Sequence, residues 1–573
     1  MLLTRFIIIS LLFFNNLYDN PKDKTIFISP LKIPLLLSAN FGELRIDHFH
    51  SGLDIKTQGA TGKEVVAAAD GYIFRISVSP GGFGKALYIR HPSGYETVYG
   101  HLNNFTKEVE DYVIARQYEE KSYLVTIFPE KDKFPVKQGE TIAWSGNSGA
   151  SGGAHLHYEI RKAEDEFPIN PLLFDFGIKD NIKPVIEKLV IYPINSKALI
   201  NNQHNTKTIN VSGSNGKYSV SSENGISISG IAGFGIKSYD LLNDSNNKCA
   251  VYSIELKIDS IPVFKYVMDG FSFSESRYIN SHIDYERYMK NNIYVERAFV
   301  LPNDKLSVYK ETINRGAYNF NDNKIHNAEI SVTDIQQNRS SLLFNIKSQI
   351  PVSQYLAEPI NKDLKLMPFN IRNKFSSENI FINIPTGALY DTLYFSYKTT
   401  PGTKEMFSDL HYVDNIYTPL NKPYTLSIKP SGIPAAKQSK MLIVQYVDEL
   451  KRNAIKSTWA ESYLSAEVSS FGKFYIGIDT VAPVISANGL VNGAIITGRK
   501  ELKINITDDF SGIKSYEPYI DGKWALFAYD QKNNVIIYSF DERRITKGLK
   551  HSLRLKVTDN TDNTSFYYCD FTW

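Results

Sequence analysis

The chain has 573 residues, of which 42% are hydrophobic and 22% charged, and its formal net charge is +3. This composition is ordinary for a globular protein, so it excludes disorder or a coiled-coil rod as the main state. The near balance of charges gives no long-range field that would attract a nucleic acid, so no nucleic-acid partner is expected. At about 150 residues per domain, the length predicts about four domains.

The N-terminal residues have the pattern of an export signal. Arg5 precedes Phe6–Phe14, in which Ser10 is the only polar residue. An apolar segment of this length fits the core of a signal peptide and is shorter than the about 20 residues of a membrane-spanning helix. The small-residue cleavage pattern is absent, so a buried strand or an uncleaved anchor is the alternative. We expect residues 1–20 to be a signal peptide or short N-terminal anchor, with no stable transmembrane span in the mature protein.

Residues 25–174 combine short apolar segments with glycine turns, which predicts short β-strands. The exception is Lys107–Ser122, where apolar and charged residues alternate with the period of a short surface helix. This region also holds six of the eleven histidines: His48, His50, His91, His101, His155 and His157. Such clustering is the first indication of a metal site.

After Phe174 the sequence changes to long alternating runs separated by Asn, Asp and Gly turns, which is typical of β-sandwiches. An internal repeat supports this division, because three short blocks recur in the same order. Asp180–Ile186 matches Asp479–Ile485, Gly235–Tyr239 matches Gly512–Tyr516, and Val332–Asn338 matches Val557–Asn563. We expect a mainly β protein in which residues 25–174 are followed by about three immunoglobulin-like β-sandwich modules. Their expected bounds are 175–348 (with an insertion), 349–477 and 478–573.

Cysteine usage excludes a disulfide scaffold and a structural zinc module with four cysteine ligands, because only Cys249 and Cys569 occur. Whether these two residues pair is left open by the sequence.

Three short motifs carry residues suited to metal chemistry. In His155-Leu156-His157, residues two apart on a strand point to the same face, so both imidazoles are expected to project together. His50 and Asp54 offer an imidazole and a carboxylate, which are normal zinc ligands. His48 is a rival ligand because it also forms a His-x-His pair with His50. The third motif contains His101 at the end of an expected strand.

Taken together and in this order, the motifs resemble the lysostaphin-type (LytM-like, duplicated hybrid motif) zinc metalloendopeptidases that cut peptidoglycan peptides. The similarity covers about residues 38–174 and runs through four segments: His50–Ile55, Gly62–Gly71, Gly82–Leu102 and Val136–Glu159. The resemblance implies an antiparallel β catalytic domain of that type. It identifies His50, Asp54 and His157 as ligands of one Zn²⁺ per chain, and His101 and His155 as catalytic histidines. It makes His91 structural, and we interpret His48 as a supporting or solvent-facing residue.

Three protein ligands would leave a fourth zinc position for water, which is the arrangement of a catalytic site. Zinc lowers the pKa of such a water to about 7, and a histidine can take or give the proton. No HExxH motif occurs, so a helical zinc protease with a glutamate base is excluded. The sequence does not decide which histidine is the base. Arg45 is either a contact for a substrate carboxylate or a surface residue.

The sequence therefore predicts an exported zinc metalloendopeptidase that hydrolyses peptide cross-links of bacterial peptidoglycan, in the periplasm or cell envelope or after secretion. Two alternatives are a non-catalytic envelope regulator of another wall hydrolase and a zinc peptidase with a protein substrate. An envelope protein could also bind the β tail. One departure from the family pattern is the long segment Asn103–Phe134, which is either a wall of the cleft or a packing insertion remote from it.

Overall fold

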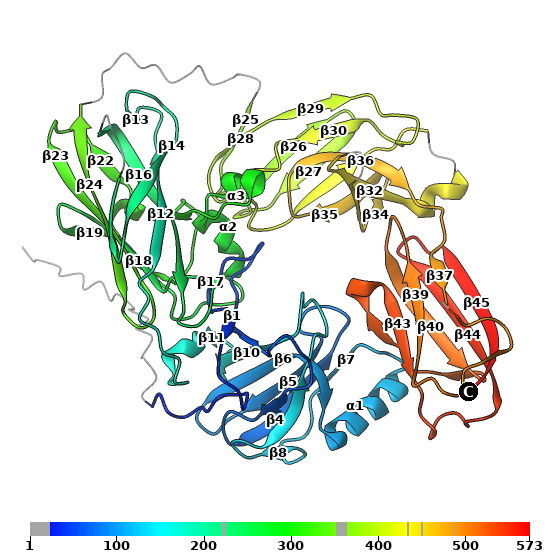
Figure 1. Cartoon of the computed structure of the whole chain (residues 1–573). Coiled ribbons are helices and arrows are strands. Elements are labelled where there is room, and N and C mark those ends of the chain that lie inside the picture. The colour runs from blue at the N-terminus through cyan, green and yellow to red at the C-terminus, as the bar shows by residue number, and fades with distance from the viewer. Residues whose placement is uncertain (1–22, 221–224, 351–363, 433–434, 449–450, 488) are drawn as a thin grey trace, which may run out of the picture.

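The computed structural model describes residues 23–220, 225–350, 364–432, 435–448, 451–487 and 489–573. The expected signal peptide, residues 1–20, lies outside them. The described chain is mainly β, with an antiparallel N-terminal domain followed by β-rich lobes, which confirms the expected fold class. The four parts form a ring in Figure 1. We name them by the domain boundaries proposed from the sequence: the N-terminal domain (25–174), the second lobe (175–348), the third lobe (349–477) and the fourth lobe (478–573).

The N-terminal domain is built on one antiparallel sheet whose main path runs β1-β2-β10-β6-β5-β4-β7. Its helices are α1 (Lys107–Glu120), within the range expected for a helix, and the 3₁₀ turn η1 (Pro171–Leu173). Its strands are β1 (Leu37–Ala39), β2 (Leu53–Lys56), β3 (Glu64–Val66), β4 (Gly71–Val78), β5 (Lys85–Arg90), β6 (Tyr95–Phe105), β7 (Val125–Ile127), β8 (Pro135–Val136), β9 (Thr141–Ser145), β10 (His155–Lys162) and β11 (Pro168–Ile169).

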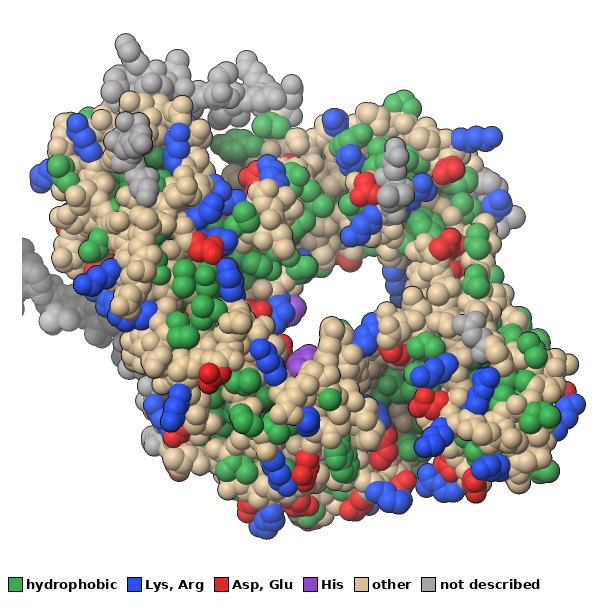
Figure 2. Space-filling model, viewed as in Figure 1, with side chains coloured by type: hydrophobic (Ala, Val, Ile, Leu, Met, Phe, Trp, Pro, Cys, Tyr) green, Lys and Arg blue, Asp and Glu red, His purple; other side chains and the backbone are tan. Residues whose placement is uncertain are grey.

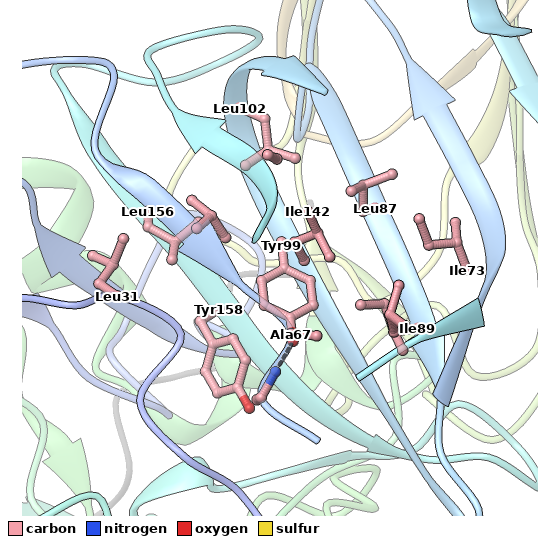
Figure 3. Close-up of a cluster of buried hydrophobic side chains, with 14 of the residues drawn as sticks. Leu31, Ala67, Ile73, Leu87, Ile89, Tyr99, Leu102, Ile142, Leu156 and Tyr158 are labelled. Carbon is pink, nitrogen blue, oxygen red and sulfur yellow. Dashed lines mark hydrogen bonds between the residues drawn. The ribbon is translucent and has the colours of Figure 1, made fainter. Parts of the chain in front are cut away.

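Strand alternation decides which side chains of β10 enter the hydrophobic core. Leu156 and Tyr158 are completely buried in the core of the N-terminal domain, where Tyr158 lies beside Tyr99 (Figure 3). The hydroxyl of Tyr99 accepts a hydrogen bond of 2.9 Å from the backbone N–H of Ala68. Burying Leu156 and Tyr158 fixes the register of β10, because a slip by one residue would turn both side chains to the opposite face. The histidines of β10 therefore project from the other face.

The second lobe has one large twisted sheet that folds over a core of its own. Its helical segments are η2 (Ser276–Tyr278), α2 (Ile279–His282), α3 (Tyr285–Asn291) and η3 (Ile313–Gly316). Its strands are β12 (Val185–Pro193), β13 (Leu199–Ile200), β14 (Lys207–Ser214), β15 (Lys217–Val220), β16 (Ile226–Leu241), β17 (Lys248–Cys249), β18 (Ser253–Ile258), β19 (Ile261–Val267), β20 (Glu296–Arg297), β21 (Tyr309–Thr312), β22 (Tyr318–Phe320), β23 (Ile325–Thr333) and β24 (Arg339–Gln349).

The third lobe packs two five-stranded sheets over one core, and the two-stranded β25-β28 ladder lies beside them. Its one described helical turn is η4 (Ala435–Lys440). Its strands are β25 (Lys365–Met367), β26 (Asn373–Ser377), β27 (Ile380–Ile384), β28 (Leu393–Phe395), β29 (Tyr397–Thr400), β30 (Leu410–Val413), β31 (Tyr424–Ile428), β32 (Met441–Tyr446), β33 (Arg452–Ile455), β34 (Thr458–Ala460), β35 (Tyr463–Val468) and β36 (Gly472–Ile478).

The fourth lobe packs a four-stranded sheet on a five-stranded one. Its described helical turn is η5 (Gln531–Asn533). Its strands are β37 (Val484–Ser486), β38 (Ala494–Ile495), β39 (Glu501–Thr507), β40 (Ile513–Ile520), β41 (Lys523–Trp524), β42 (Ala528–Asp530), β43 (Val535–Ser539), β44 (Lys550–Asp559) and β45 (Thr564–Thr572).

The fourth lobe closes the ring by packing against α1 of the N-terminal domain (Figure 1). The rings of Tyr118 and Trp524 meet edge to face with centroids 5.3 Å apart. The guanidinium of Arg544 lies 3.9 Å from the centroid of the Tyr118 ring, and Arg543 forms a 3.3 Å ion pair with Asp111. Figure 2 shows an opening through the middle of the ring, with histidine side chains visible at its edge.

The third lobe contains a histidine that is buried in its neutral form. His411 is completely buried, its Nδ1 lies 2.8 Å from the hydroxyl of Tyr397, and its Nε2 has no hydrogen-bond partner. Burial lowers the pKa of His411 to about 4. In the unfolded chain this histidine titrates near pH 6.5. Between pH 6.5 and 4 the unfolded chain therefore binds the proton more readily than the folded chain does. Folding stability that is present above pH 6.5 is therefore lost as the pH falls through this range.

We expect this one group to make the third lobe about 2 kcal/mol less stable at pH 5 than at pH 7. Urea unfolding of the full chain at both pH values, followed by circular dichroism, measures the difference. In the His411→Gln variant the side chain no longer titrates, so the pH dependence should be smaller by that amount. An unchanged pH dependence in the variant would show that other groups cause it.

Candidate metal centre and active site

Two side chains from neighbouring strands and one from a loop converge at one point on the face of the N-terminal sheet that is turned away from its core. Asp54 on β2 pairs in register with His157 on β10, and His50 lies in the loop that leads into β2. The Nε2 atom of His50 lies 3.0 Å from Oδ1 of Asp54 and 3.1 Å from Nδ1 of His157. The third side of this triangle, from His157 Nδ1 to Asp54 Oδ1, is 2.9 Å.

The spacing and chemistry of these atoms fit a zinc ion. Two ligands that are each about 2.0–2.1 Å from a tetrahedral zinc lie about 3.3–3.4 Å apart, so the three atoms need to separate only slightly to hold the ion. Two imidazoles and one carboxylate are a normal zinc ligand set, and three protein ligands leave one position for water. His50, Asp54 and His157 together form one of the residue groups in the described chain whose atoms are close enough for a shared metal ion.

His50 is oriented by contacts that reach into the second lobe. Its Nδ1–H donates a 2.7 Å hydrogen bond to the carbonyl of Asn40, which leaves Nε2 directed at Asp54. The side chain of Asn40 in turn exchanges two hydrogen bonds of 2.8 Å with the backbone of Ala250. A loop of the second lobe therefore holds the residue that fixes the ring of a candidate ligand.

His157 is oriented by a buried carboxylate. Its Nε2–H donates a 2.8 Å hydrogen bond to Glu159, which also accepts bonds of 2.5 Å from Ser51 and Arg161. Burial disfavours the charged imidazole, but the hydrogen bonds to Asp54 and Glu159 outweigh it and raise the pKa of His157 to about 9. Burial likewise disfavours the charged form of Glu159, but Arg161 and His157 lower its pKa to about 2.

Asp54 is a carboxylate at the centre of three histidines. Burial opposes its charge, but hydrogen bonds from His155, His157 and His50 hold the pKa of Asp54 far below its usual range. Its second oxygen, Oδ2, faces the guanidinium of Arg45 at 3.4 Å. Arg45 therefore lies at the candidate site, where it contacts the carboxylate that we expect to bind metal.

His101 is held in a strained backbone conformation next to this cluster. It has a φ of 57°, which residues other than glycine rarely adopt and which is often found at functional sites. Its Nδ1–H donates a 2.8 Å hydrogen bond to the carbonyl of Ser148, so Nε2 is the free acceptor. Burial and the neighbouring histidines lower the pKa of His101 to about 4, so the ring is neutral at neutral pH.

His155 lies next to the candidate metal position. Its Nε2 is 3.4 Å from Oδ1 of Asp54, and its Nδ1 lies 2.9 Å from the carbonyl of Gly153. The rings of His101 and His155 have centroids 4.8 Å apart. The structure thus brings all five residues identified from the sequence into one cluster, although their roles remain proposals.

Two loops form the rim beside the histidines. Gly149 has a φ of 70°, and a Cβ there would lie 2.3 Å from the backbone nitrogen of Gly84, so only glycine fits. The ring of Phe83 stacks on His157 with centroids 4.7 Å apart, which excludes water from that side of the imidazole. Lys532 of the fourth lobe donates hydrogen bonds to the carbonyls of Asn147 and Ser151, the latter at 3.0 Å, so that lobe reaches the same rim.

The two remaining histidines of this domain are not part of the cluster. His91 is buried and bonded to the carbonyl of Asp70 and the hydroxyl of Thr97, at 2.9 and 2.8 Å. His48 is exposed, and its Nδ1 lies 2.8 Å from the carbonyl of Ile46. Both observations agree with the sequence interpretation.

The sequence left two roles open for the segment Asn103–Phe134: a wall of the cleft or a packing insertion remote from it. It contains α1 and β7, and α1 carries the contacts with the fourth lobe. Glu110 of α1 pairs with Lys85 at 2.7 Å, and a cavity of about 510 Å³ lies between this helix and residues 526–543. The insertion is therefore a docking surface for the fourth lobe, which borders the rim described above.

Both cysteines are free and buried, Cys249 against the core of the N-terminal domain and Cys569 in the core of the fourth lobe. Burial raises the pKa of Cys249 to about 12. The question of pairing is therefore answered: the structure contains no disulfide between them.

Comparisons with known proteins agree with the resemblance noted in the sequence. Residues 48–118 match the model of peptidase family M23, and residues 364–479 match that of the Zu5-like domain. The chain is 36% identical over 111 residues to an uncharacterized metalloprotease of Haemophilus influenzae, covering 19% of this chain and 18% of that protein. It is 33% identical over 123 residues to the DD-carboxypeptidase/endopeptidase Mpg of Neisseria meningitidis, covering 22% of each.

The name of a third relative describes an activator and not a peptidase. The murein hydrolase activator NlpD of Escherichia coli is 28% identical over 125 residues, covering 22% of this chain and 26% of that protein. Among solved structures, the catalytic domain of lysostaphin from Staphylococcus simulans is 21% identical, with a TM-score of 0.18, and the match covers 23% of this chain and 86% of that one. The chain spans only about a fifth of the length of the first curated relatives that it matches.

The family match and the relatives place a peptidase family M23 domain of the lysostaphin type at the N-terminal part of this chain, which confirms the resemblance. The third lobe is Zu5-like. No helix in the described residues is long and apolar enough to cross a membrane.

The carboxylate that holds His157 offers a direct test of the candidate centre. Glu159→Gln removes the charge behind His157, and loss of such a supporting group typically weakens metal binding about 10–100-fold. Competition with a zinc-chelating dye measures the affinity. Glu166→Gln is the matched control, because Glu166 also pairs with Arg161, at 2.9 Å, but forms no hydrogen bond or ion pair with His157. An equal loss in both variants would assign the effect to Arg161 instead.

Proposed function

We propose that the protein is an exported zinc metalloendopeptidase that hydrolyses peptide cross-links of bacterial peptidoglycan in the cell envelope. The observation that supports this most directly is the tripod of His50, Asp54 and His157, whose ligating atoms lie 2.9–3.1 Å apart. The M23 family match and the Neisseria relative, whose name describes an endopeptidase, support the reaction class.

The zinc held by these three residues would polarise the scissile carbonyl and supply an acidified water molecule as the nucleophile. The protein's own side chains handle the proton. His101 is neutral at neutral pH and presents Nε2 as an acceptor, so it can take a proton from the attacking water. His155 faces the same point from β10 and can donate a hydrogen bond to the oxyanion of the tetrahedral intermediate. The reverse assignment of the two histidines uses the same geometry.

The fourth lobe contacts the rim loop of the candidate site, so the ring borders this chemistry. Histidines line the edge of the opening in Figure 2, and Lys532 of the fourth lobe contacts the rim loop. A flexible peptide bridge can enter such an opening more easily than a folded protein domain, because it presents an extended backbone. This favours a peptide cross-link over a folded protein as the substrate.

The alternative is an activator of another wall hydrolase, as the name of the Escherichia coli relative states for that protein. An activator needs no metal ligands, whereas this chain provides all three of them together with both candidate catalytic histidines. The five-residue cluster therefore favours an enzyme.

Digestion of purified sacculi by the zinc-loaded full chain, with mass spectrometry of the products, tests the proposal and names the bond that is cut. We expect release of peptide fragments by the wild type and none by the His155→Ala variant or after chelation of zinc. If sacculi of several cross-link types all remain intact, the endopeptidase proposal is wrong. Stimulation of an added wall amidase by the inactive variant would instead favour the activator.

A further inference from the structure

A second cluster of candidate ligands lies in the second lobe, in a region that the proposed peptidase does not use. The carboxylates of Asp180, Asp240 and Asp334 converge so that one oxygen of each lies within 4.8 Å of the others. Asp240 is 3% exposed and Asp334 is 1% exposed, so two of these three acids are buried. Three acids this close would repel one another strongly in a buried place unless a cation lies between them.

The side chains that the structure describes supply no such cation. In the described part of the chain, no lysine or arginine forms an ion pair with any of the three aspartates; the nearby Lys237 and Lys248 both pair with Glu187 instead. Without a cation, burial and the two neighbouring carboxylates raise the pKa of Asp240 to about 8. The electrostatic cost of assembling these acids is therefore not offset by an ion pair with a basic side chain of the described residues.

The hydrogen bonds around the cluster leave oxygens free at its centre. Asp334 accepts bonds of 2.8 and 2.7 Å from the backbone and side chain of Asn338, and Oδ1 of Asp180 accepts one of 3.0 Å from Ile182. Oδ2 of Asp180 and Oδ1 of Asp240 are buried and have no hydrogen-bond partner. Unpaired buried polar atoms are rare in folded proteins and indicate a missing partner.

The local structure holds these side chains firmly. Asp240 lies near the end of β16, opposite Cys249 on β17. Asp334 directly follows β23, and Asn338 ties its turn to the backbone of Asp180, 3.2 Å away. Three separate segments of the lobe thus bring one carboxylate each to a fixed point, which is how a coordination site is built.

We infer that Asp180, Asp240 and Asp334 bind one divalent cation of the oxygen-preferring class, Ca²⁺, in the second lobe. Calcium takes six to eight oxygen ligands in a flexible geometry, so carboxylates, backbone carbonyls and water together can complete its coordination. Zinc at a closed structural site would use nitrogen or sulfur ligands, which this cluster does not offer. The expected dissociation constant is about 10⁻⁵ to 10⁻³ M, in the range of sensor and extracellular sites.

The internal repeat shows what distinguishes this site. Asp479 and Asp559 match Asp180 and Asp334 in the repeat and form a similar trio with Asp508 in the fourth lobe. In the fourth lobe, however, backbone N–H groups donate hydrogen bonds to these carboxylates. Gly512 donates to Asp508 at 2.6 Å, and Asn563 donates to Asp559 at 2.8 Å. None of the carboxylate oxygens of Asp479, Asp508 and Asp559 is both buried and without a hydrogen-bond partner, so the inference is confined to the second lobe.

A cation there would also steady the support of His50. The segment that follows Asp240 continues to Ser245, whose hydroxyl bonds the carbonyl of Leu37 at 3.1 Å, and to Ala250, which holds Asn40. The ion would therefore fix the segment through which the second lobe contacts the N-terminal domain.

The test uses the full chain, loaded with zinc, and Ca²⁺ as the probe. Equilibrium dialysis and isothermal titration calorimetry should show that Asp240→Asn lowers the number of Ca²⁺ bound per chain by one. Asp244→Asn is the matched control, because it removes the same charge from an exposed residue with a φ of 62° that asparagine readily adopts. It should bind as many ions as the wild type.

Thermal unfolding separates a ligand from a merely structural residue. Without Ca²⁺, Asp240→Asn should unfold at the same temperature as the wild type or above it, because the substitution removes one of three crowded charges. With millimolar Ca²⁺ the wild type should unfold at the higher temperature. Equal Ca²⁺ stoichiometry in the wild type and Asp240→Asn, or a loss of stability in that variant that is the same with and without Ca²⁺, would overturn the inference. Loss of an ion in Asp244→Asn would also overturn it.

Discussion

The His157→Ala variant is expected to lose bound zinc and all hydrolysis of peptidoglycan. The His101→Ala variant should keep its zinc and show only a lower rate of hydrolysis. His157 supplies one of three candidate ligand atoms, 2.9 Å from Asp54, and two ligands are too few to hold the ion firmly. His101 lies outside the tripod, and its proposed role is proton transfer, which typically raises the rate of hydrolysis about 10²–10⁴-fold. Atomic absorption gives the zinc content, and release of muropeptides gives the rate.

This comparison needs a check on folding, because His157 is buried beside Glu159 and Asp54. Circular dichroism and the unfolding temperature of both variants provide it. His91→Gln is a further control, since His91 is buried in the same domain but bonded to Asp70 and Thr97, away from the tripod. Retention of stoichiometric zinc by His157→Ala would contradict the ligand assignment, and full activity of His101→Ala would contradict its role in proton transfer.

Deletion of residues 179–573 is expected to destabilise the N-terminal domain and to weaken its zinc binding, whereas deletion of residues 480–573 should do neither. Phe41 and Phe49 belong to the N-terminal domain but pack into the core of the second lobe, with ring centroids 5.2 and 5.5 Å from Phe271. Both are at most 2% exposed, and exposing two such rings costs about 3–6 kcal/mol. The longer deletion also removes Ala250, which holds Asn40 behind His50.

Urea unfolding and zinc content of the two truncated chains, measured beside the full chain, distinguish these expectations. The shorter deletion is the matched control, because it keeps the packing of Phe41 and Phe49 but loses the contacts of α1 with the fourth lobe. Similar stability and zinc content in both truncated chains would show that the N-terminal domain does not depend on the second lobe.

The sequence predicted those features that depend on local pattern. Alternation along β10 placed Leu156 and Tyr158 in the core and both histidines on the other face, because side chains on a strand point alternately to its two sides. The spacing of apolar and charged residues in Lys107–Ser122 predicted α1, because residues three or four apart share one face of a helix. The set of five site residues came from a family resemblance, since three motifs so far apart in sequence have no periodicity that links them.

Other features depended on contacts between distant segments and could not be predicted. Asn40 and Ala250 are separated by 210 positions, and neither residue type suggests a role in a metal centre. The strained backbone of His101 results from an irregular register between β5 and β6, which no local sequence signal reports. Glu159, in contrast, lies two residues from His157 on the same face of β10, so alternation could have identified it as a supporting carboxylate.

The closure of the ring has a consequence for how the protein is made. The contacts of Tyr118 with Leu526 and of Ser151 with Lys532 span 408 and 381 positions, so they form only after the ribosome has completed the fourth lobe. The N-terminal domain emerges first and can fold together with the second lobe before the fourth lobe is made. During that interval the rim beside the histidines is open and the aromatic face of α1 is uncovered. A nascent or truncated chain would therefore present its candidate active site without the fourth lobe beside it.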